Sequence, residues 1–335
     1  MLKKMLLIFV ISLLPLFAQG QNYIFIAQWN LENLYDTEDD PLTNDEDFTP
    51  KGMYKWTNEK LFIKFVRLSE IIRAMNDNKA PDILTVCEVE NLAVLNTLAM
   101  YKEFLGDYNY GVIHKDSPDR RGVDVGIFYK KDIFDFVELI DDTVKIDWPT
   151  RTIIMGKLVH KETKDTFYVF SNHWPSRRGG EERSAPARNK AGETLRKRVD
   201  YIFSYNPTAN IIIMGDFNDT PKNESILKHL KANKFVCEKD KDKVEPMNLY
   251  NLSWARADND EGSHYFDDEW SMLDQIIVST NLINSEKYEY PCGSFNMYTG
   301  KNVDAQDLPI RTFEGRKWIG GYSDHLPVYA KILIK

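Results

Sequence analysis

Cysteine is scarce in this 335-residue chain, which contains only Cys87, Cys237 and Cys292. Their spacing matches no cysteine-based metal site, and an odd number of cysteines cannot pair completely into disulfides. Cys87 lies inside the apolar run DILTVCEV, so we expect it to be a buried thiol. A bridge between Cys237 and Cys292 is compatible with the sequence.

The chain also lacks low-complexity segments, internal repeats and any linker rich in proline, glycine or serine. Its composition, 43% hydrophobic and 28% charged, is that of an ordinary globular protein with a sizeable core. The length would allow two average domains or one large domain. Because nothing divides the chain, we expect one domain over residues 21–335.

Long apolar runs are absent except at the N-terminus, where residues 5–18 follow Lys3 and Lys4 and precede a polar Gln-Gly-Gln segment. This order is typical of a secretory signal peptide, and a buried first helix or strand is the alternative. The run is shorter than the roughly 20 residues that a membrane span needs. We therefore expect residues 1–20 to be removed and the protein to be exported, to the periplasm or the outside of the cell, without stable membrane insertion.

Positive charge is in deficit. The formal net charge is −8, and loss of Lys3 and Lys4 with the signal peptide would change it from −8 to −10. A protein that holds nucleic acid mainly by releasing counterions would be basic. If this chain acts on a phosphate-bearing substrate, a bound cation and a local group of arginines must offset the repulsion.

The hydrophobic pattern predicts an α/β protein. Alternating or continuous apolar runs predict strands at 23–30, 82–90, 122–130, 152–160, 166–174, 210–218, 272–280 and 326–334. A period near 3.6 predicts helices at 58–75, 92–104, 187–203 and 225–232. Strands alternate with helices early and meet as pairs later, which favours mixed sheets with helices outside.

Polar groups gather at the ends of these apolar runs. The strand NIIIM runs into Gly-Asp-Phe-Asn-Asp at 215–219, and a buried strand ends in charge only at a cost unless the charge is paired or holds a metal. A simple turn is the alternative for this one site. The same pattern recurs at five further places, and turn chemistry does not favour glutamate or histidine at so many ends. The polar residues concerned are Asn30, Glu32, Glu88, His173, Asp216, Asn218, Asp274, Asp324 and His325.

At this point the motifs resemble a known family. WNLENLYD, DILTVCEVEN, SNHWPS, GDFND, SMLDQIIVS and YSDHLPV occur in the order found in the endonuclease/exonuclease/phosphatase superfamily, whose members include DNase I-like nucleases. The resemblance covers residues 23–335. It implies a four-layer α/β sandwich, in which two mixed β-sheets pack face to face with helices outside.

The resemblance also implies a metal site. Glu88 matches the principal metal ligand of the family, Asn30 and Glu32 match positions that complete or support the site, and we count Asp324 with them. The family more often has Asp or Asn where Glu32 stands, which leaves the distance of Glu32 from the metal in doubt. The implied cofactor is Mg²⁺, with Mn²⁺ or Ca²⁺ as alternatives, because hard cations prefer oxygen ligands.

The same resemblance assigns catalytic roles. Asp216 would orient or deprotonate the attacking water, and Asn218 would hold water and phosphate. His325 would contact the phosphate, with Asp274 and Asp324 as the carboxylates beside its ring. His173 would protonate the leaving oxygen or bind phosphate, and a purely structural role is its alternative. The other histidines, His114, His160, His229 and His264, receive no role.

Arginines are the expected contacts for substrate phosphates on this acidic protein. We select Arg121, Arg177 and Arg188, for which a solvated basic surface is the alternative. Arg121 and Asp124 would be either a phosphate contact with its partner or a turn followed by a strand face.

Three functions are compatible with these residues: a nuclease, a phosphatase or phospholipase acting on inositol phosphates or sphingomyelin, and an inactive binding module. Inositol phosphatases usually have Trp-Cys-Asp-Arg where this chain has Met272-Leu273-Asp274-Gln275, and the aromatic residues of loop 293–321 are scattered among charges. We therefore expect an exported nuclease that hydrolyses nucleic-acid phosphodiesters with water. We expect a monomer without a protein partner.

Overall fold

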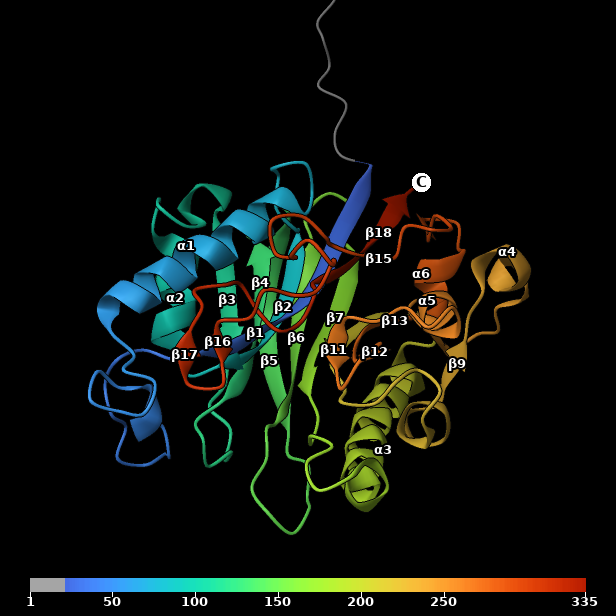
Figure 1. Ribbon diagram of the computed structural model, residues 1–335. Coiled ribbons are helices and arrows are strands. Elements are labelled where there is room, and N and C mark those ends of the chain that lie inside the picture. The colour runs from blue at the N-terminus through green and yellow to red at the C-terminus, as the bar shows by residue number, and fades with distance from the viewer. Residues whose placement is uncertain (1–21) are drawn as a thin grey trace, which may run out of the picture.

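The computed structural model describes residues 22–335, so the expected signal peptide lies outside the described residues. Two seven-stranded sheets dominate this part of the chain (Figure 1). The first has the order β14 (Tyr288–Glu289), β18 (Val328–Ile334), β1 (Tyr23–Leu34), β2 (Ile83–Val89), β4 (Asp124–Lys130) and β3 (Tyr110–His114), with β15 (Asn296–Met297) also paired to β18. The second has the order β5 (Phe134–Asp142), β6 (Ile153–His160), β7 (Thr166–His173), β8 (Asn210–Asp216), β13 (Asp274–Ser279), β10 (Leu249–Asn251) and β9 (Ala232–Lys234).

Both sheets are mixed. The pairs β1–β2, β7–β8 and β9–β10 are parallel, whereas β6 and β7 form the antiparallel hairpin that the sequence predicts. Two small hairpins complete the strands: β11 (His264–Phe266) with β12 (Glu269–Ser271), and β16 (Phe313–Glu314) with β17 (Lys317–Trp318).

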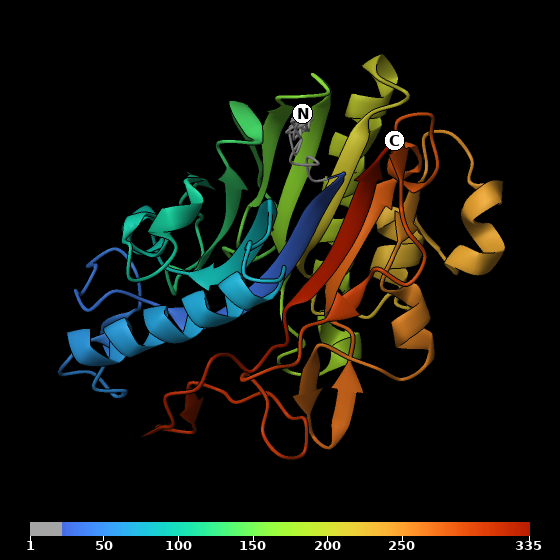
Figure 2. The same cartoon turned by 90° about the horizontal axis from the view of Figure 1, so that it is seen from above.

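Helices cover the outer faces of the sheets, as Figure 2 shows for α1 on one side and α3 on the other. The α-helices are α1 (Asn58–Ala74), α2 (Leu92–Met100), α3 (Glu181–Tyr205), α4 (Cys237–Asp240), α5 (Trp254–Asp258) and α6 (Thr280–Ile283). Shorter or wider turns are η1 (Glu46–Phe48), η2 (Gly106–Tyr108), the π-helical η3 (Ser225–Leu230) and η4 (Lys241–Lys243). The predicted four-layer sandwich is confirmed.

Alternation along β1 explains why its apolar run is continuous. Ile24 and Ile26 pack into the core between the two sheets, whereas Phe25, Ala27 and Trp29 pack into the core beneath α1 and α2. A third core lies between the second sheet and α3. Each central strand therefore buries both of its faces, which is the situation that favours an unbroken apolar sequence.

Helix ends follow local sequence signals. The side chain of Thr57 accepts a hydrogen bond from the backbone nitrogen of Lys60 and so caps α1. Helix α3 begins six positions earlier than predicted, and Pro186 lies inside it. Glu181 and Glu182 occupy its first turn, where negative charge stabilises the helix dipole.

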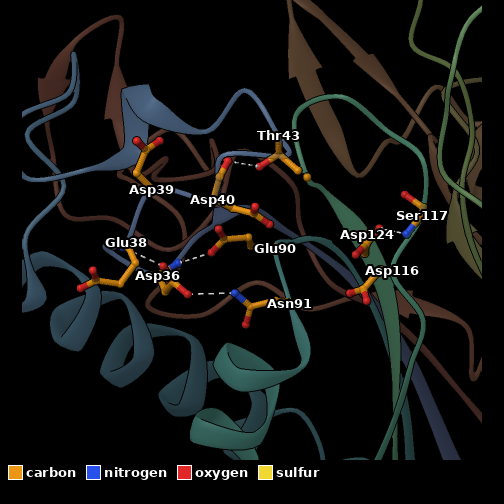
Figure 3. Close-up of a pocket in the computed structure, with 11 residues that line it drawn as sticks. Asp36, Glu38, Asp39, Asp40, Thr43, Glu90, Asn91, Asp116, Ser117 and Asp124 are labelled. Atoms are coloured by element: carbon orange, nitrogen blue, oxygen red, sulfur yellow. Dashed lines mark hydrogen bonds between the residues drawn. The ribbon is translucent and has the colours of Figure 1, made fainter.

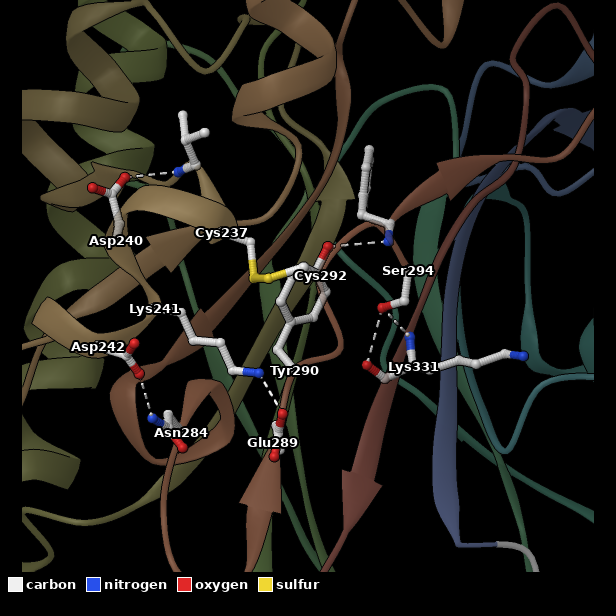
Figure 4. Close-up of a disulfide and its surroundings, with 12 residues drawn as sticks. Cys237, Asp240, Lys241, Asp242, Asn284, Glu289, Tyr290, Cys292, Ser294 and Lys331 are labelled. Atoms are coloured by element: carbon white, nitrogen blue, oxygen red, sulfur yellow. Dashed lines mark hydrogen bonds and ion pairs between the residues drawn. A yellow bond between two sulfur atoms is a disulfide. The ribbon is translucent and has the colours of Figure 1, made fainter.

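Cys237 and Cys292 form a disulfide with their Cα atoms 5.4 Å apart, whereas Cys87 is free and buried. The expected buried thiol of Cys87 is confirmed, and the bridge that the sequence left open is present. Figure 4 shows the bridge beside an ion pair of Lys241 with Glu289, so two contacts hold the segment around α4 against the loop after β14. In residues 22–335, none of the helices has the length and apolar character that crossing a membrane requires.

The ends of β1, β2, β7 and β8 meet at one edge of the sandwich, the lower edge in Figure 1. At this edge the strand pairing is irregular, with register shifts after Asn30 and after Cys87. Glu32, Asn33 and Glu88 have positive φ angles of 50°, 54° and 58°. Such angles are uncommon outside glycine and concentrate at functional sites.

Candidate active site

Four other predicted site residues gather at or near the carboxylate of Asp216. Its Oδ2 accepts a hydrogen bond from Nδ2 of Asn30 at 3.2 Å. The Nε2 atoms of His173 and His325 lie 3.7 Å and 3.9 Å from the same oxygen. Nε2 of His173 also lies 3.9 Å from Oε1 of Glu88. Residues from four strands and from the turn before β18 thus share one small polar centre.

Asp274 holds His325 in place. Its Oδ2 lies 2.6 Å from Nδ1 of the imidazole and also accepts a hydrogen bond from Oγ of Ser263 at 2.7 Å. Nε2 of Gln28 donates to the other oxygen at 3.3 Å. Burial alone would lower the pKa of His325, but the charge and hydrogen bond of Asp274 outweigh it and raise this pKa well above its usual value. Asp274 therefore orients the imidazole of His325 and favours its protonated form.

The loop after β8 fixes Asp216 from the other side. The backbone nitrogen of Asn218 donates to Oδ1 of Asp216 at 2.9 Å, and Nδ2 of Asn218 donates to the carbonyl of Trp174 at 3.0 Å. Burial raises the pKa of Asp216 to about 6, opposed by the charge of His325 and reinforced by that of Asp274. A carboxylate with this pKa is ionised at pH 7 and still basic enough to accept a proton.

His173 is buried, and within residues 22–335 its Nδ1 has no hydrogen-bond partner. Burial lowers its pKa well below the usual value, and the charges of Arg151 and Arg121 lower it further. The imidazole is therefore neutral at pH 7. Arg151, which the sequence did not single out, donates from Nε to the carbonyl of His173 at 3.1 Å and from Nη2 to that of Trp174.

Glu88 offers an oxygen for a metal. Its Oε2 accepts a hydrogen bond from the backbone nitrogen of Asn33 at 3.0 Å, whereas no donor within residues 22–335 bonds to its Oε1. The side chain is 17% exposed, so it can be reached from solvent. Glu88 and the amide of Asn30, whose Oδ1 accepts a hydrogen bond from the backbone nitrogen of Glu32 at 2.9 Å, supply oxygen atoms of the kind that Mg²⁺ prefers. These residues fit the divalent cation that the family resemblance implies.

Glu32 is engaged elsewhere. Its Oε2 accepts a hydrogen bond from the backbone nitrogen of Thr312 at 2.6 Å. Burial raises the pKa of Glu32 to about 7, with the charge of the fully buried Lys64 opposing this. Burial likewise lowers the pKa of Lys64 to about 8. A metal-binding role for Glu32 stays a prediction. The hydrogen bond from Thr312 already occupies Oε2 of its carboxylate.

Asp324 lies with two histidines. Ligand atoms of His264, Asp324 and His325 all lie within 4.8 Å of one another, and the rings of His264 and His325 have centroids 4.4 Å apart. Burial, followed by the charge of His325, lowers the pKa of His264 to about 4. His264 had no role predicted from the sequence, and the structure places it against the candidate catalytic imidazole. No spacing signal links positions so far apart in the chain.

Two of the selected arginines are bonded to other residues of the protein. Arg188 does not lie on the surface as we expected: it is fully buried, with Nε 2.7 Å from Oδ1 of Asp219. The buried carboxylate needs this partner. Arg177 donates from Nε to the carbonyl of Asn218 at 2.8 Å and pairs with Glu181 at 3.0 Å. It fixes the loop after β8 rather than presenting a free guanidinium.

Arg121 remains accessible, with 48% of its side chain exposed and its Nε 3.3 Å from Asp119. Its expected partner Asp124 instead pairs with Nε2 of His114 at 3.1 Å. The suggestion of an Arg121–Asp124 pair is therefore wrong, because the side chain of Asp124 bonds to its neighbour on the adjacent strand β3.

Glu90 faces a different environment from Glu88. It lines an acidic pocket of about 270 Å³, and Figure 3 shows its side chain close to those of Asp36 and Asp40. Its Oε2 accepts a hydrogen bond from the backbone nitrogen of Asp36 at 2.6 Å. Burial raises the pKa of Glu90 to about 8. The two glutamates at the end of β2 thus serve separate sites.

The chain is similar to known proteins in sequence pattern and in fold. The pattern of the endonuclease/exonuclease/phosphatase family matches residues 25–334. The fold is similar to the human Nocturnin catalytic domain with bound sulfate anion (18% identity, 94% of each chain covered, TM-score 0.56). It is also similar to humanized D. rerio TDP2 (13% identity, 93% of this chain and 99% of that chain, TM-score 0.58).

A third similar structure is the mannosyl-6-phosphatase Bt3783 of Bacteroides thetaiotaomicron (17% identity, 93% of this chain and 99% of that chain, TM-score 0.55). Comparison with curated proteins gave no match. At these identities the structural matches show the fold alone, whereas the family pattern spans almost every described residue. The chain belongs to the endonuclease/exonuclease/phosphatase family and is a metal-dependent phosphoric ester hydrolase.

Proposed function

We propose that this protein is an exported nuclease that hydrolyses phosphodiester bonds in nucleic acid by in-line attack of water. The observation that carries the proposal is the charged pair Asp274–His325 directed at Asp216, with the open oxygen of Glu88 beside it. This combination offers a proton acceptor, a fixed positive charge and a metal ligand around one centre. Hydrolysis of a phosphoric ester by water needs these three elements.

Each residue of the site has its own role in the proposed hydrolysis. Asp216 accepts the proton of the attacking water, because its raised pKa leaves it ionised but basic. His325, kept charged by Asp274, neutralises oxygens of the phosphate. Asn218 positions water and phosphate through its amide. His173 lies on the Glu88 side of Asp216 and contacts the leaving oxygen.

Glu88 and Asn30 would hold the divalent cation, for which we propose Mg²⁺, with Mn²⁺ or Ca²⁺ as alternatives. When bound, this cation supplies Lewis-acid charge to the phosphate. Asp324 with His264 and His325 forms a further group with metal-ligand chemistry, and we propose that Asp324 assists either the cation or the imidazole.

A phosphatase or phospholipase is the second candidate, favoured by the likeness to a mannosyl-6-phosphatase. Against it, the segment Met272-Leu273-Asp274-Gln275 departs from the pattern usual in inositol phosphatases. A binding module without activity is the third. The convergence of Asn30, Glu88, Asp216, Asp274 and His325 argues against it, because a binding function needs no such set.

One panel of assays tests the proposal. The purified protein is incubated with Mg²⁺, Mn²⁺ or Ca²⁺ and with single-stranded DNA, duplex DNA, RNA, sphingomyelin, inositol polyphosphates and mannose 6-phosphate. We expect kcat/KM to be highest on nucleic acid and to vanish in excess EDTA. Phosphate release from a monoester as the dominant activity would refute the nuclease, and full activity in EDTA would refute the metal.

We further propose export as a monomer without stable membrane insertion or a protein partner. The apolar residues 5–18 and the Cys237–Cys292 disulfide support export, since disulfides persist in oxidising compartments. N-terminal sequencing of protein recovered from outside the cytoplasm should begin near residues 19–22. Exported protein that still begins at Met1 contradicts the signal peptide, and sedimentation at twice the expected mass contradicts the monomer.

A further inference from the structure

An arginine groove lies beside the candidate active site. It is a cavity of about 680 Å³ between three segments: the loop after β5, the turn before β4 and the loop that leads from β7 into α3. In Figure 1 the loop after β5 and the start of α3 both lie at the lower edge of the second sheet. Among the residues that line this groove are Arg120, Arg121, Trp148, Arg151, Arg178 and Arg183.

The groove is strongly basic on an acidic protein. Five arginines line it against a single acid, Asp119. Asp119 is already shared, since it pairs with both Arg121 and Arg151 at 3.3 Å and 3.0 Å. Like charges gathered in one cavity repel one another unless an anion lies among them. The groove therefore gathers more positive charge than a surface exposed only to solvent needs.

Three of these arginines have no internal partner. Within residues 22–335, the side chains of Arg120, Arg178 and Arg183 make neither a hydrogen bond nor an ion pair, and all three residues are exposed. Arg177 and Arg188, which we had selected for phosphates, are engaged with the protein. Arg120, Arg178 and Arg183 thus present to the groove guanidinium groups that are free to bind oxyanions.

The groove is connected to the reacting centre. Arg151 lines it and donates hydrogen bonds to the carbonyls of His173 and Trp174. Pro175 and Ser176, which follow directly, also line the groove. A nucleic-acid backbone that passes the reacting centre on the side of His173 would therefore continue into the groove.

Trp148 adds an aromatic surface. Its side chain lies in the wall of the groove and is 50% exposed. Indole rings beside a basic groove stack on nucleic-acid bases, an interaction that requires an unpaired base. A sugar monophosphate carries a single phosphate and no planar base, so it would leave most of this groove unused.

We propose that the arginine groove binds single-stranded nucleic acid next to the scissile phosphodiester, with non-scissile phosphates on Arg178 and Arg183 and one base on Trp148. This inference rests on the proposed nuclease function and names its substrate as single-stranded. Arg120 and Arg121, from the turn before β4, also line the groove and would extend the path of the phosphates.

Binding without hydrolysis gives the first test. Anisotropy of a fluorescein-labelled ten-nucleotide oligothymidine is measured in excess EDTA over a range of salt concentrations. We expect the Arg178→Ala/Arg183→Ala double variant to bind at least about 5-fold more weakly, and its slope of log K against log salt to fall by roughly 0.7 for each phosphate that is no longer neutralised. Trp148→Ala should also bind at least about 5-fold more weakly, and Trp148→Phe should recover most of the affinity.

Matched controls come from exposed residues on other surfaces. Arg316→Ala, in the turn between β16 and β17, and Tyr201→Ala, on the outer face of α3, should bind the oligonucleotide as the unmodified protein does. Thermal melting checks that each variant is folded. A duplex of the same length should bind more weakly and should respond little to Trp148→Ala.

Kinetics in Mg²⁺ give the second test. The groove variants should raise KM on single-stranded DNA by about 5-fold or more relative to KM on bis(4-nitrophenyl) phosphate, with kcat changed less. Groove variants that bind and cleave like the controls overturn the inference while nuclease activity stands. Unmodified protein that cleaves no nucleic acid refutes the function, even where the groove variants lose binding.

Two other results would also overturn the inference. Equal losses on single-stranded and duplex DNA for Trp148→Ala mean that no unpaired base stacks there. Variants that lose binding to vesicles containing anionic phospholipid, but keep binding to the oligonucleotide, assign the groove to a lipid headgroup.

Discussion

Asp274 and His325 are separated by 51 positions in the chain, and Oδ2 of the one lies 2.6 Å from Nδ1 of the other. Both residues are buried, with Ser263 and Gln28 holding the carboxylate. The pair therefore places the positive charge of His325 next to Asp216. Asp274 favours this charge because it raises the pKa of His325.

Asp274→Asn should lower kcat by roughly 10²-fold, because it removes the charge that keeps His325 protonated while leaving the side chain nearly the same size. The pKa of His325 is raised by Asp274, so its loss lets the imidazole deprotonate at lower pH. The alkaline limb of the kcat/KM profile should then move to lower pH. Asp200→Asn, an exposed acid on α3, is the control, and an unmoved limb in Asp274→Asn contradicts the role.

Glu88→Gln should abolish stabilisation by metal. In thermal melting with increasing Mg²⁺ or Mn²⁺, the unmodified protein should gain stability that rises with the logarithm of the metal concentration once this exceeds Kd. Glu88→Gln should not, since a neutral amide is a poor ligand for a hard cation. Glu90→Gln, which alters the acidic pocket two positions away, should keep the response and most of the activity. Identical behaviour of the two variants would show that the end of β2 is wrongly assigned.

His173→Ala should lose about 10²-fold in rate on DNA if His173 assists the leaving oxygen. A nitrophenyl phosphodiester has a good leaving group that departs without a proton, so the same variant should be much less impaired on it. His325→Ala should be impaired on both, because charge on the phosphate must be neutralised whatever leaves. Equal losses on the two substrates for His173→Ala would assign it to phosphate binding or to structure.

Glu90→Gln should raise stability at high pH. Burial raises the folded-state pKa of Glu90 to about 8, above its ordinary value of 4.5. A carboxyl group with a raised pKa gives stability that is full below pH 4.5 and is lost as pH rises to 8. The variant should therefore melt on the order of 2 °C higher at pH 9 and at nearly the same temperature at pH 4.5. A lower Tm at pH 9 would contradict the buried charge.

Loss of the disulfide should destabilise the fold. The bridge closes a loop over 55 positions of sequence, and such links typically contribute about 2–4 kcal/mol. The double variant Cys237→Ser/Cys292→Ser should unfold at lower denaturant concentration than the oxidised protein. Dithiothreitol should bring the unmodified protein to the level of the variant and leave the variant unchanged. A variant that still responds to dithiothreitol would place the sensitive bond elsewhere.

The sequence by itself determined the long elements and the strand ends. Continuous apolar runs such as residues 211–214 are dictated by burial on both faces, and the acids that follow them mark where the chain leaves the core. The order of motifs then indicated the four-layer sandwich. Strands of two or three residues, such as β9 and β15, are too short for a period of two to be recognised.

Only the tertiary structure decided which polar residues share a site. His264 and Arg151 had no local signal, yet the ring of the first lies against that of His325 and the second donates a hydrogen bond to the backbone carbonyl of His173. Arg188 was expected as a surface cation, yet it is the buried partner of Asp219. The physical reason is the separation of the partners along the chain. The periodicity of a sequence indicates only which face of its own helix or strand is buried. Ion pairs and hydrogen bonds between elements depend on the register in which distant strands pair.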